Sequence, residues 1–157
     1  MAITGPNYAK EFIAENGGKY AQVDNLLYFK TGAVMEVGMM TEHGWFGRSW
    51  DPPTNDYERL GNQIWYWRGV LLGAEQAFHK VRDHIAEDID QYTPQQIRKA
   101  LTKARGDVRA VRDKLKELRE ARAKTPEGRH IVERQRVDEH LEATRSEARD
   151  ALKKIKI

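Results

Sequence analysis

Apolar residues recur in alternating steps of four and three along most of the chain after residue 56. The first series is Leu60, Ile64, Trp67, Leu71, Ala74, Phe78, Val81 and Ile85. Residues with this spacing form a stripe along one side of an α-helix, and the heptad repeat is typical of helices that pack side by side. The pattern therefore predicts a long helix over residues 56–88.

Two further series predict two more long helices. The second is Ile97, Leu101, Ala104, Val108, Val111, Leu115 and Leu118; the third, which is weaker, is Val137, Leu141, Thr144, Ala148, Ala151 and Ile155. Thr93-Pro94 and Thr125-Pro126 supply the capping residues at the two starts. Because the link between these two helices is short, we expect them to form an antiparallel hairpin over residues 94–157. The first helix either completes a three-helix bundle or runs away from it.

The first 55 residues show shorter patterns. Pro6–Asn16 reads as a short helix that ends at two glycines. Three strand-like runs follow at residues 19–23, 26–30 and 33–37, and they predict a small antiparallel meander. Residues 38–55 have no regular period and read as a long aromatic loop. The expected fold is mainly α, with a small helix-plus-meander unit at residues 1–55 and a helical region at residues 56–157.

The amino-acid composition excludes several classes of protein. The chain has 157 residues and no cysteine, which excludes disulfides, cysteine-ligated zinc and thiol catalysis. Charged residues make up 32% and hydrophobic residues 39%, as is ordinary for long amphipathic helices. The first residues lack the pattern of a secretory signal, and no run of roughly 18 apolar residues predicts a membrane span. We expect a cytoplasmic protein that does not enter a membrane.

Charge is distributed unevenly along the chain. Residues 91–157 contain 19 Lys and Arg against 11 Asp and Glu, a net charge of +8, although the whole chain carries only +3. The first 90 residues are therefore acidic, at −5. The two parts either attract each other, within one chain or between copies, or leave the basic part for an acidic partner.

Trp65, Tyr66 and Trp67 stand side by side in the first long helix. Trp67 belongs to the heptad stripe, whereas Trp65 and Leu72 form a second stripe that needs its own cover. Either the N-terminal unit covers it, or a partner protein binds there, since Trp and Tyr are frequent interface anchors. The predicted partner-binding residues are Trp45, Trp50, Trp65, Tyr66 and Leu72.

Basic residues follow the second stripe at heptad spacing. They are Arg98, Arg105, Arg112 and Arg119, with Arg109 and Lys116 in a neighbouring row. Residues beside a stripe usually form ion pairs between helices, and the available partners are Glu133, Asp138 and Glu147 of the third helix or Glu75 of the first. The alternative is that the row contacts a phosphate backbone without sequence specificity.

Candidate catalytic and metal-binding groups are weak. Glu75, His79 and Asp83 share one helical face, but a single straight helix seldom supplies the geometry of a three-ligand metal site. Glu42, His43 and Asp51 lie in the aromatic loop without a recognisable nucleophile nearby. We therefore expect no enzyme, no cofactor and no bound metal.

These observations favour a non-enzymatic structural or assembly protein. It would contact copies of itself or a larger complex through helical and aromatic surfaces, as components of viral particles and similar multi-subunit machines do. The alternative is a nucleic-acid-binding accessory protein that uses the basic helix at residues 94–124.

Overall fold

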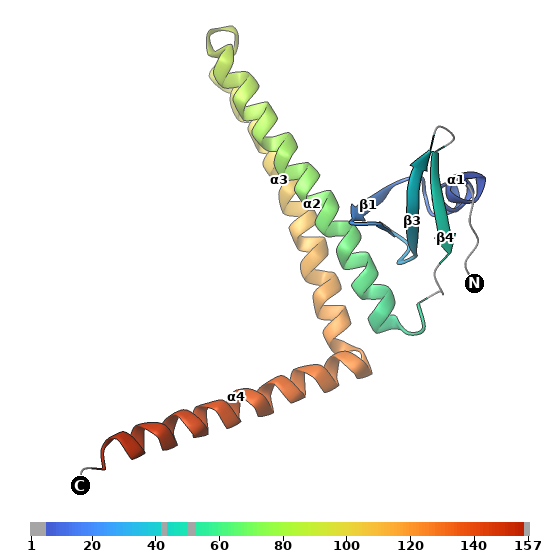
Figure 1. Cartoon of the computed structure of the whole chain (residues 1–157). Coiled ribbons are helices and arrows are strands. Elements are labelled where there is room, and N and C mark those ends of the chain that lie inside the picture. Colours follow the sequence, from blue (N-terminus) through green and yellow to red (C-terminus); the bar gives the residue numbers. More distant parts are fainter. Residues whose placement is uncertain (1–5, 42–43, 50–52, 156–157) are drawn as a thin grey trace.

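The chain is mainly α-helical and has a small N-terminal helix and an antiparallel sheet, as predicted (Figure 1). The structure is a computed structural model, and it describes residues 6–41, 44–49 and 53–155. The elements follow in the order α1 (Pro6–Glu15), β1 (Tyr20–Val23), β2 (Leu26–Phe29), β3 (Val34–Thr41), β4 (Gly44–Ser49), α2 (Asp56–Glu87), a 3₁₀ turn (Ile89–Gln91), α3 (Pro94–Lys124) and α4 (Pro126–Lys153).

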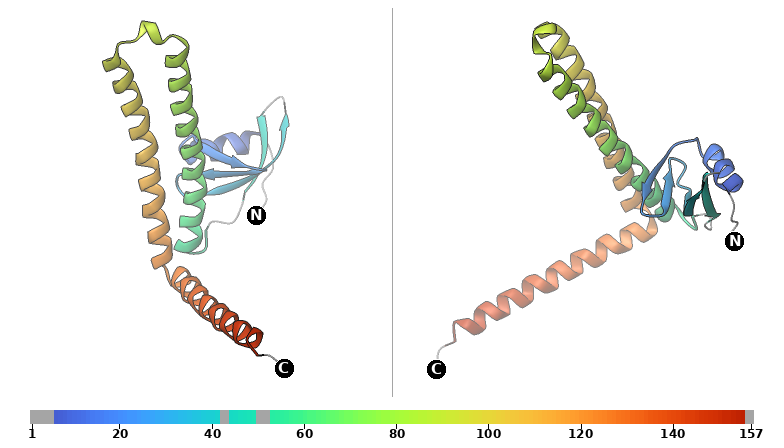
Figure 2. Two further views of the ribbon diagram at one scale, coloured as in Figure 1. Left: turned by 90° about the vertical axis from the view of Figure 1, so that its left-hand side faces the viewer. Right: turned by 45° about the horizontal axis from the view of Figure 1, so that its top comes forward.

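Helices α2 and α3 form a long antiparallel hairpin (Figures 1 and 2). Their heptad stripes face each other, and the buried cluster between them consists of Leu60, Ile64, Val111, Leu115 and Leu118. Burying each of these side chains contributes roughly 1.5–3 kcal/mol. The first helix therefore packs against the second, which the sequence left undecided.

The predicted hairpin of the last two helices is wrong. Helix α4 leaves the end of α3 at a steep angle and runs away from the other helices (Figure 1). Thr125 is the only residue between them, serving as the C-cap of α3 and the N-cap of α4. Packed helix axes lie about 8–10 Å apart, and one residue is too short to reverse the chain across that distance. Between α2 and α3, residues 88–93 provide the necessary length.

The sheet has four strands in the order β1-β2-β3-β4 rather than the predicted three. Strand β3 continues to Thr41, and β4 lies within the stretch that reads as a loop in the sequence. The register between β3 and β4 shifts between Val37 and Met40. Such an irregularity breaks the alternation by which strands are recognised, so the sequence did not reveal β4.

Helix α1 covers one face of the sheet. Leu27 and Phe29 of β2 are fully buried, with Met35 and Val37 of β3 and Ala9 of α1. The ring of Phe12 contacts Phe29 edge to face, with centroids 5.4 Å apart. Residue Tyr28 between Leu27 and Phe29 therefore lies on the opposite face, towards α2.

Helix α2 holds the sheet in place through polar contacts and a close approach. Asn62 Nδ2 donates to the carbonyl of Gly32 at 2.9 Å, and Gln63 Nε2 donates to the carbonyl of Lys30 at 3.0 Å. About two helical turns further, a Cβ on Gly69 would lie 2.5 Å from the Cβ of Ala21 in β1. The absence of a side chain at Gly69 lets the strand approach the helix.

Substitution of Gly69 tests this approach, and Gly73 one turn later is a matched control. A Cβ at Gly73 meets nothing within 4 Å. Gly73→Ala should stabilise the chain by about 1 kcal/mol through helix propensity, raising Tm by roughly 2–4 °C. Gly69→Ala should lower Tm instead, because β1 must move away. Thermal unfolding followed by circular dichroism measures both, and an equal gain for both variants would contradict the packing.

Candidate interaction surfaces

The aromatic stripe of α2 is partly covered by the sheet. Trp65 stacks on Tyr28, with centroids 5.7 Å apart and ring planes at 23°, and the Arg68 guanidinium lies over the indole at 4.5 Å. Burial and then the nearby Asp24 carboxylate raise the pKa of the Tyr28 phenol above its ordinary value. Trp65 itself remains 38% exposed. The N-terminal unit thus covers part of the aromatic stripe, and the rest of the stripe is exposed.

The other predicted partner-binding residues have different positions. Tyr66 is buried, with its ring edge to face against Trp67 at 5.4 Å, and it is one of the residues that line the groove described next, so its role in binding stays a prediction. Leu72 is 57% exposed. Trp45 lies in β4, where it pairs with Met40, and Trp50 lies outside the described residues.

An open groove of about 920 Å³ runs between β1 and the hairpin. Tyr20 and Gly69 line it together with Trp65 and Leu72, and Arg119 of α3 also contributes. The groove joins the exposed parts of the aromatic stripe to the arginine row. It is a shallow surface of mixed apolar and basic character.

The arginine row makes some of the predicted contacts between helices. Arg112 Nη2 donates to Glu75 Oε1 of α2 at 3.3 Å, which confirms that ion pair. The Arg105 guanidinium lies 5.9 Å from the Phe78 ring. All six basic residues of both rows are exposed, and no ion pair or ring contact with α2 is found for Arg98, Arg109, Lys116 and Arg119 among the described residues. These helix-to-helix contacts favour a structural role for the row over a role in phosphate binding.

The junction of α3 and α4, which we call the elbow, consists of Arg122, Thr125 and Gly128. Thr125 Oγ1 donates to the carbonyl of Arg122 at 2.6 Å and accepts from the amide of Gly128 at 3.1 Å. Gly128 is buried so closely against that carbonyl that a Cβ would overlap it. These two hydrogen bonds and the close approach of Gly128 to the Arg122 carbonyl set the direction in which α4 leaves.

The elbow also rests on the first turns of α2. The Arg122 guanidinium lies 4.0 Å from the Tyr57 ring, and a Cβ on Gly61 would come within 3.1 Å of it. Arg122 Nε is buried and has no hydrogen-bond partner among the described residues. The guanidinium charge is therefore stabilised by the ring face. The end of α3 is thereby held against the start of α2.

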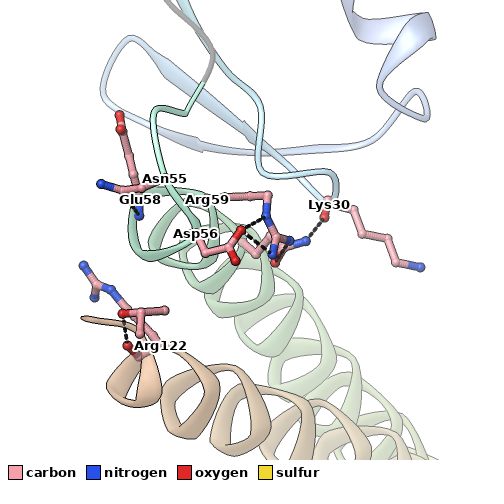
Figure 3. Close-up of polar contacts among 8 residues, drawn as sticks. Lys30, Asn55, Asp56, Glu58, Arg59 and Arg122 are labelled. Carbon is pink, nitrogen blue, oxygen red and sulfur yellow. Dashed lines mark hydrogen bonds and ion pairs between the residues drawn. The ribbon is translucent and has the colours of Figure 1, made fainter. Parts of the chain in front are cut away.

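Helix α2 begins beside Arg122 with a well-capped first turn (Figure 3). The amide of Glu58 donates to Asn55 Oδ1 at 2.8 Å, and Glu58 Oε2 accepts from the amide and hydroxyl of Thr54 at 3.0 and 2.9 Å. These hydrogen bonds lower the pKa of the Glu58 carboxyl. Capping groups of this kind order the turn on which Arg122 rests.

Helix α4 has an uncovered apolar stripe, which we call the α4 seam. It consists of Val137, Leu141, Thr144, Ala148 and Ala151, whereas Ile155, the last residue of the predicted stripe, lies two residues beyond the end of the helix at Lys153. Every seam residue is exposed; Val137 is 54% and Leu141 45% exposed. The sequence predicted that α3 would cover this stripe, but α3 packs on α2 instead. The seam was therefore missed as a candidate binding surface.

The described part of the structure does not bring together the residues that the sequence offered as catalytic groups or metal ligands. Glu42, His43 and Asp51 lie outside the described residues. Within the described ranges, no three His, Cys, Asp or Glu residues are placed to hold a metal ion. Glu75, one of the three residues considered as metal ligands, forms the ion pair with Arg112.

Comparisons with known proteins do not assign these surfaces. No protein-family model, curated protein or solved structure matches the chain. In the part of the chain that the structure describes, no helix is both long enough and apolar enough to cross a membrane. The function must therefore be inferred from the surfaces themselves.

Gly128→Ala tests whether the elbow sets the direction of α4. Because the added methyl would overlap the Arg122 carbonyl, α4 must tilt or its first turn must open. Spin labels at Lys99→Cys and Ser146→Cys, in a chain without native cysteines, report the distance between α3 and α4. Labelled chains are diluted with unlabelled chains so that only distances within one chain are measured.

The matched control is Gly106→Ala in α3, where an added Cβ meets nothing within 4 Å. We expect an unchanged distance distribution for Gly106→Ala and a shifted or broadened one for Gly128→Ala. Identical distributions in all three proteins would mean that the elbow does not determine the direction of α4.

Proposed function

We propose that the chain is a non-enzymatic assembly protein of the cytoplasm, which joins copies of itself or a larger complex through α4. The observation that carries the proposal is the α4 seam. The seams of α2 and α3 bury each other, whereas the seam of α4 is exposed along the length that the structure describes.

The energetic argument follows from the spacing of the seam. Val137 and Leu141 lie along one stripe of an isolated helix, and covering each would contribute roughly 1.5–3 kcal/mol. A long helix that contacts the rest of its chain only at one end gains little stability from tertiary packing. A partner helix supplies that packing, so the shape of the chain favours association.

The groove beside β1 supports the same proposal as a second contact area. Trp65 and Leu72 are exposed there, next to Arg119. Aromatic and arginine side chains are enriched among interface anchors. Two contact areas on one chain suit a component of a multi-subunit particle, such as that of a virus, better than they suit a simple dimer.

The alternative is a nucleic-acid-binding accessory protein that uses the basic face of α3. The exposed residues Arg98, Arg109 and Arg119 favour it, whereas the contacts of Arg105 and Arg112 with α2 count against it. Such binding would weaken steeply as salt increases. Replacing the four arginines of the row by glutamine would abolish it.

Size-exclusion chromatography with light scattering, recorded at 260 and 280 nm, separates the two functions. We expect a mass that is a multiple of 18.2 kDa with no excess absorbance at 260 nm. Val137→Gln with Leu141→Gln should lower the mass towards that of one chain. Glu139→Gln with Glu142→Gln, which lie away from the seam, should not.

A mass of 18.2 kDa at every concentration would contradict assembly through copies of the chain. Excess absorbance at 260 nm that disappears when the arginine row is replaced would favour the nucleic-acid alternative instead.

A further inference from the structure

The α4 seam lies on the side of the helix that faces away from the rest of the chain. Gly128 is buried and Val132 half-buried at the elbow. Val137 and Leu141 follow them by nine residues, which is two and a half helical turns, so they lie on the opposite side. Helix α4 also runs clear of the hairpin and the sheet (Figure 2). A second helix can therefore reach the seam without meeting the body of the chain.

The residues beside the seam match those of a second α4 that runs in the opposite direction. When Leu141 of one helix faces Thr144 of the other, heptad geometry places Asp138 opposite Arg145 and Ile131 opposite Leu152. The first of these contacts pairs opposite charges and the second pairs two apolar side chains. Because two identical antiparallel helices are related by a two-fold axis, each contact occurs twice.

The other side of the seam is complementary in the same register. Glu133 faces Lys154, and His140 faces Glu147, in each case across the two-fold axis. The imidazole N–H of His140 can donate to the carboxylate. Every charged residue at a flanking position of the pair thus meets a group that attracts it.

Neighbouring antiparallel registers place like charges together. A shift by one heptad in one direction brings Arg145 against Arg145 and Glu147 against Glu147 of the second helix. A shift in the other direction brings Asp138 against Asp138 and Glu133 against Glu147. Like charges at these positions are destabilising, so one register is favoured.

Parallel pairing is also disfavoured. In a parallel pair, a residue on one flank of the seam faces the residue that is five positions later in the sequence of the second helix. Glu133 then faces Asp138, and His140 faces Arg145. The first contact is repulsive, and the second is repulsive whenever the imidazole is protonated. The pattern of charges therefore selects a direction as well as a register.

The flanking charges are available for these contacts. Among the described residues, the ion pair on α4 joins Arg149 to Glu142 at 3.8 Å. Both residues lie on the side of the helix away from the seam. The complementary charges of the flanks are thus not already paired within the chain that the structure describes.

We propose that a second copy of the chain covers the α4 seam, its own α4 running antiparallel with Leu141 opposite Thr144. This inference rests on the proposed function and names the partner. The bodies of the two copies then lie at opposite ends of paired helices about 40 Å long. Arg134 also falls on the seam line, opposite Ala151, and a polar residue there weakens a helix pair while specifying its register.

Charge reversal at one contact tests the register. Asp138→Arg brings two arginines together at both symmetric contacts, and Arg145→Asp brings two carboxylates together. Each variant should raise the dissociation constant of the dimer about ten- to thirtyfold at low ionic strength. The swap Asp138→Arg with Arg145→Asp restores attraction and should return the constant close to its original value. Sedimentation equilibrium measures all four proteins.

Mixing the two single variants provides a second, stricter readout. Each variant alone is weakened, but a chain with Asp138→Arg and a chain with Arg145→Asp attract each other at both contacts. Their equimolar mixture should therefore form a heterodimer as tight as the original dimer. The control mixture, Glu139→Arg with Arg149→Asp, makes the same changes of charge away from the seam and should show no such gain.

Circular dichroism establishes that each variant keeps its helix content. If the chain associates but the reversals leave the dissociation constant unchanged, or the swap does not restore it, the antiparallel register is wrong while assembly stands. If the unsubstituted chain stays a monomer throughout the concentration range, this inference and assembly through copies of the chain both fail.

Discussion

The buried contact between the facing stripes of α2 and α3 holds every other part of the structure. Helix α2 carries the sheet, through Asn62, Gln63 and the close approach at Gly69. At the open end of the hairpin, Arg122 of α3 packs against Tyr57 and Gly61 at the start of α2. Without the hairpin, neither the sheet nor the elbow would have a rigid support. The narrow, long contact between α2 and α3 thus positions the sheet along its side and the elbow at its end.

The elbow explains why α4 is left without cover, although the heptad stripes of α2 and α3 cover each other. Thr125 alone separates α3 from α4, and the contact of Gly128 with the Arg122 carbonyl leaves little freedom in the turn. The chain therefore cannot fold α4 back onto the hairpin. The geometry of three residues converts an ordinary amphipathic helix into an exposed binding surface.

Much of the architecture could be predicted from the sequence, because heptad stripes and capping residues are local signals. Thr93 with Gln96 forms the expected capping box, and Thr125 caps α4. A stripe shows which side of a helix is buried but not what covers it. The pairing of helices was therefore mispredicted, although the lengths of the two links would have indicated it. The shift in register near Met40 interrupts the alternation of residues by which strands are recognised, so β4 was not predicted. Tyr66 lies off the heptad stripe, and its position in the helix did not indicate that it is buried.

Because α4 is long, a small change of angle at the elbow moves the far end of the helix by a large distance. A helix of 28 residues is about 42 Å long, so a tilt of only about 10° at its base displaces its far end by roughly 7 Å. Anything attached near Ile155 would be repositioned by substitutions more than 25 residues earlier in the chain. Selection on the spacing between assembled subunits would then act on the small side chains of the elbow, and not only on the residues that touch a neighbour.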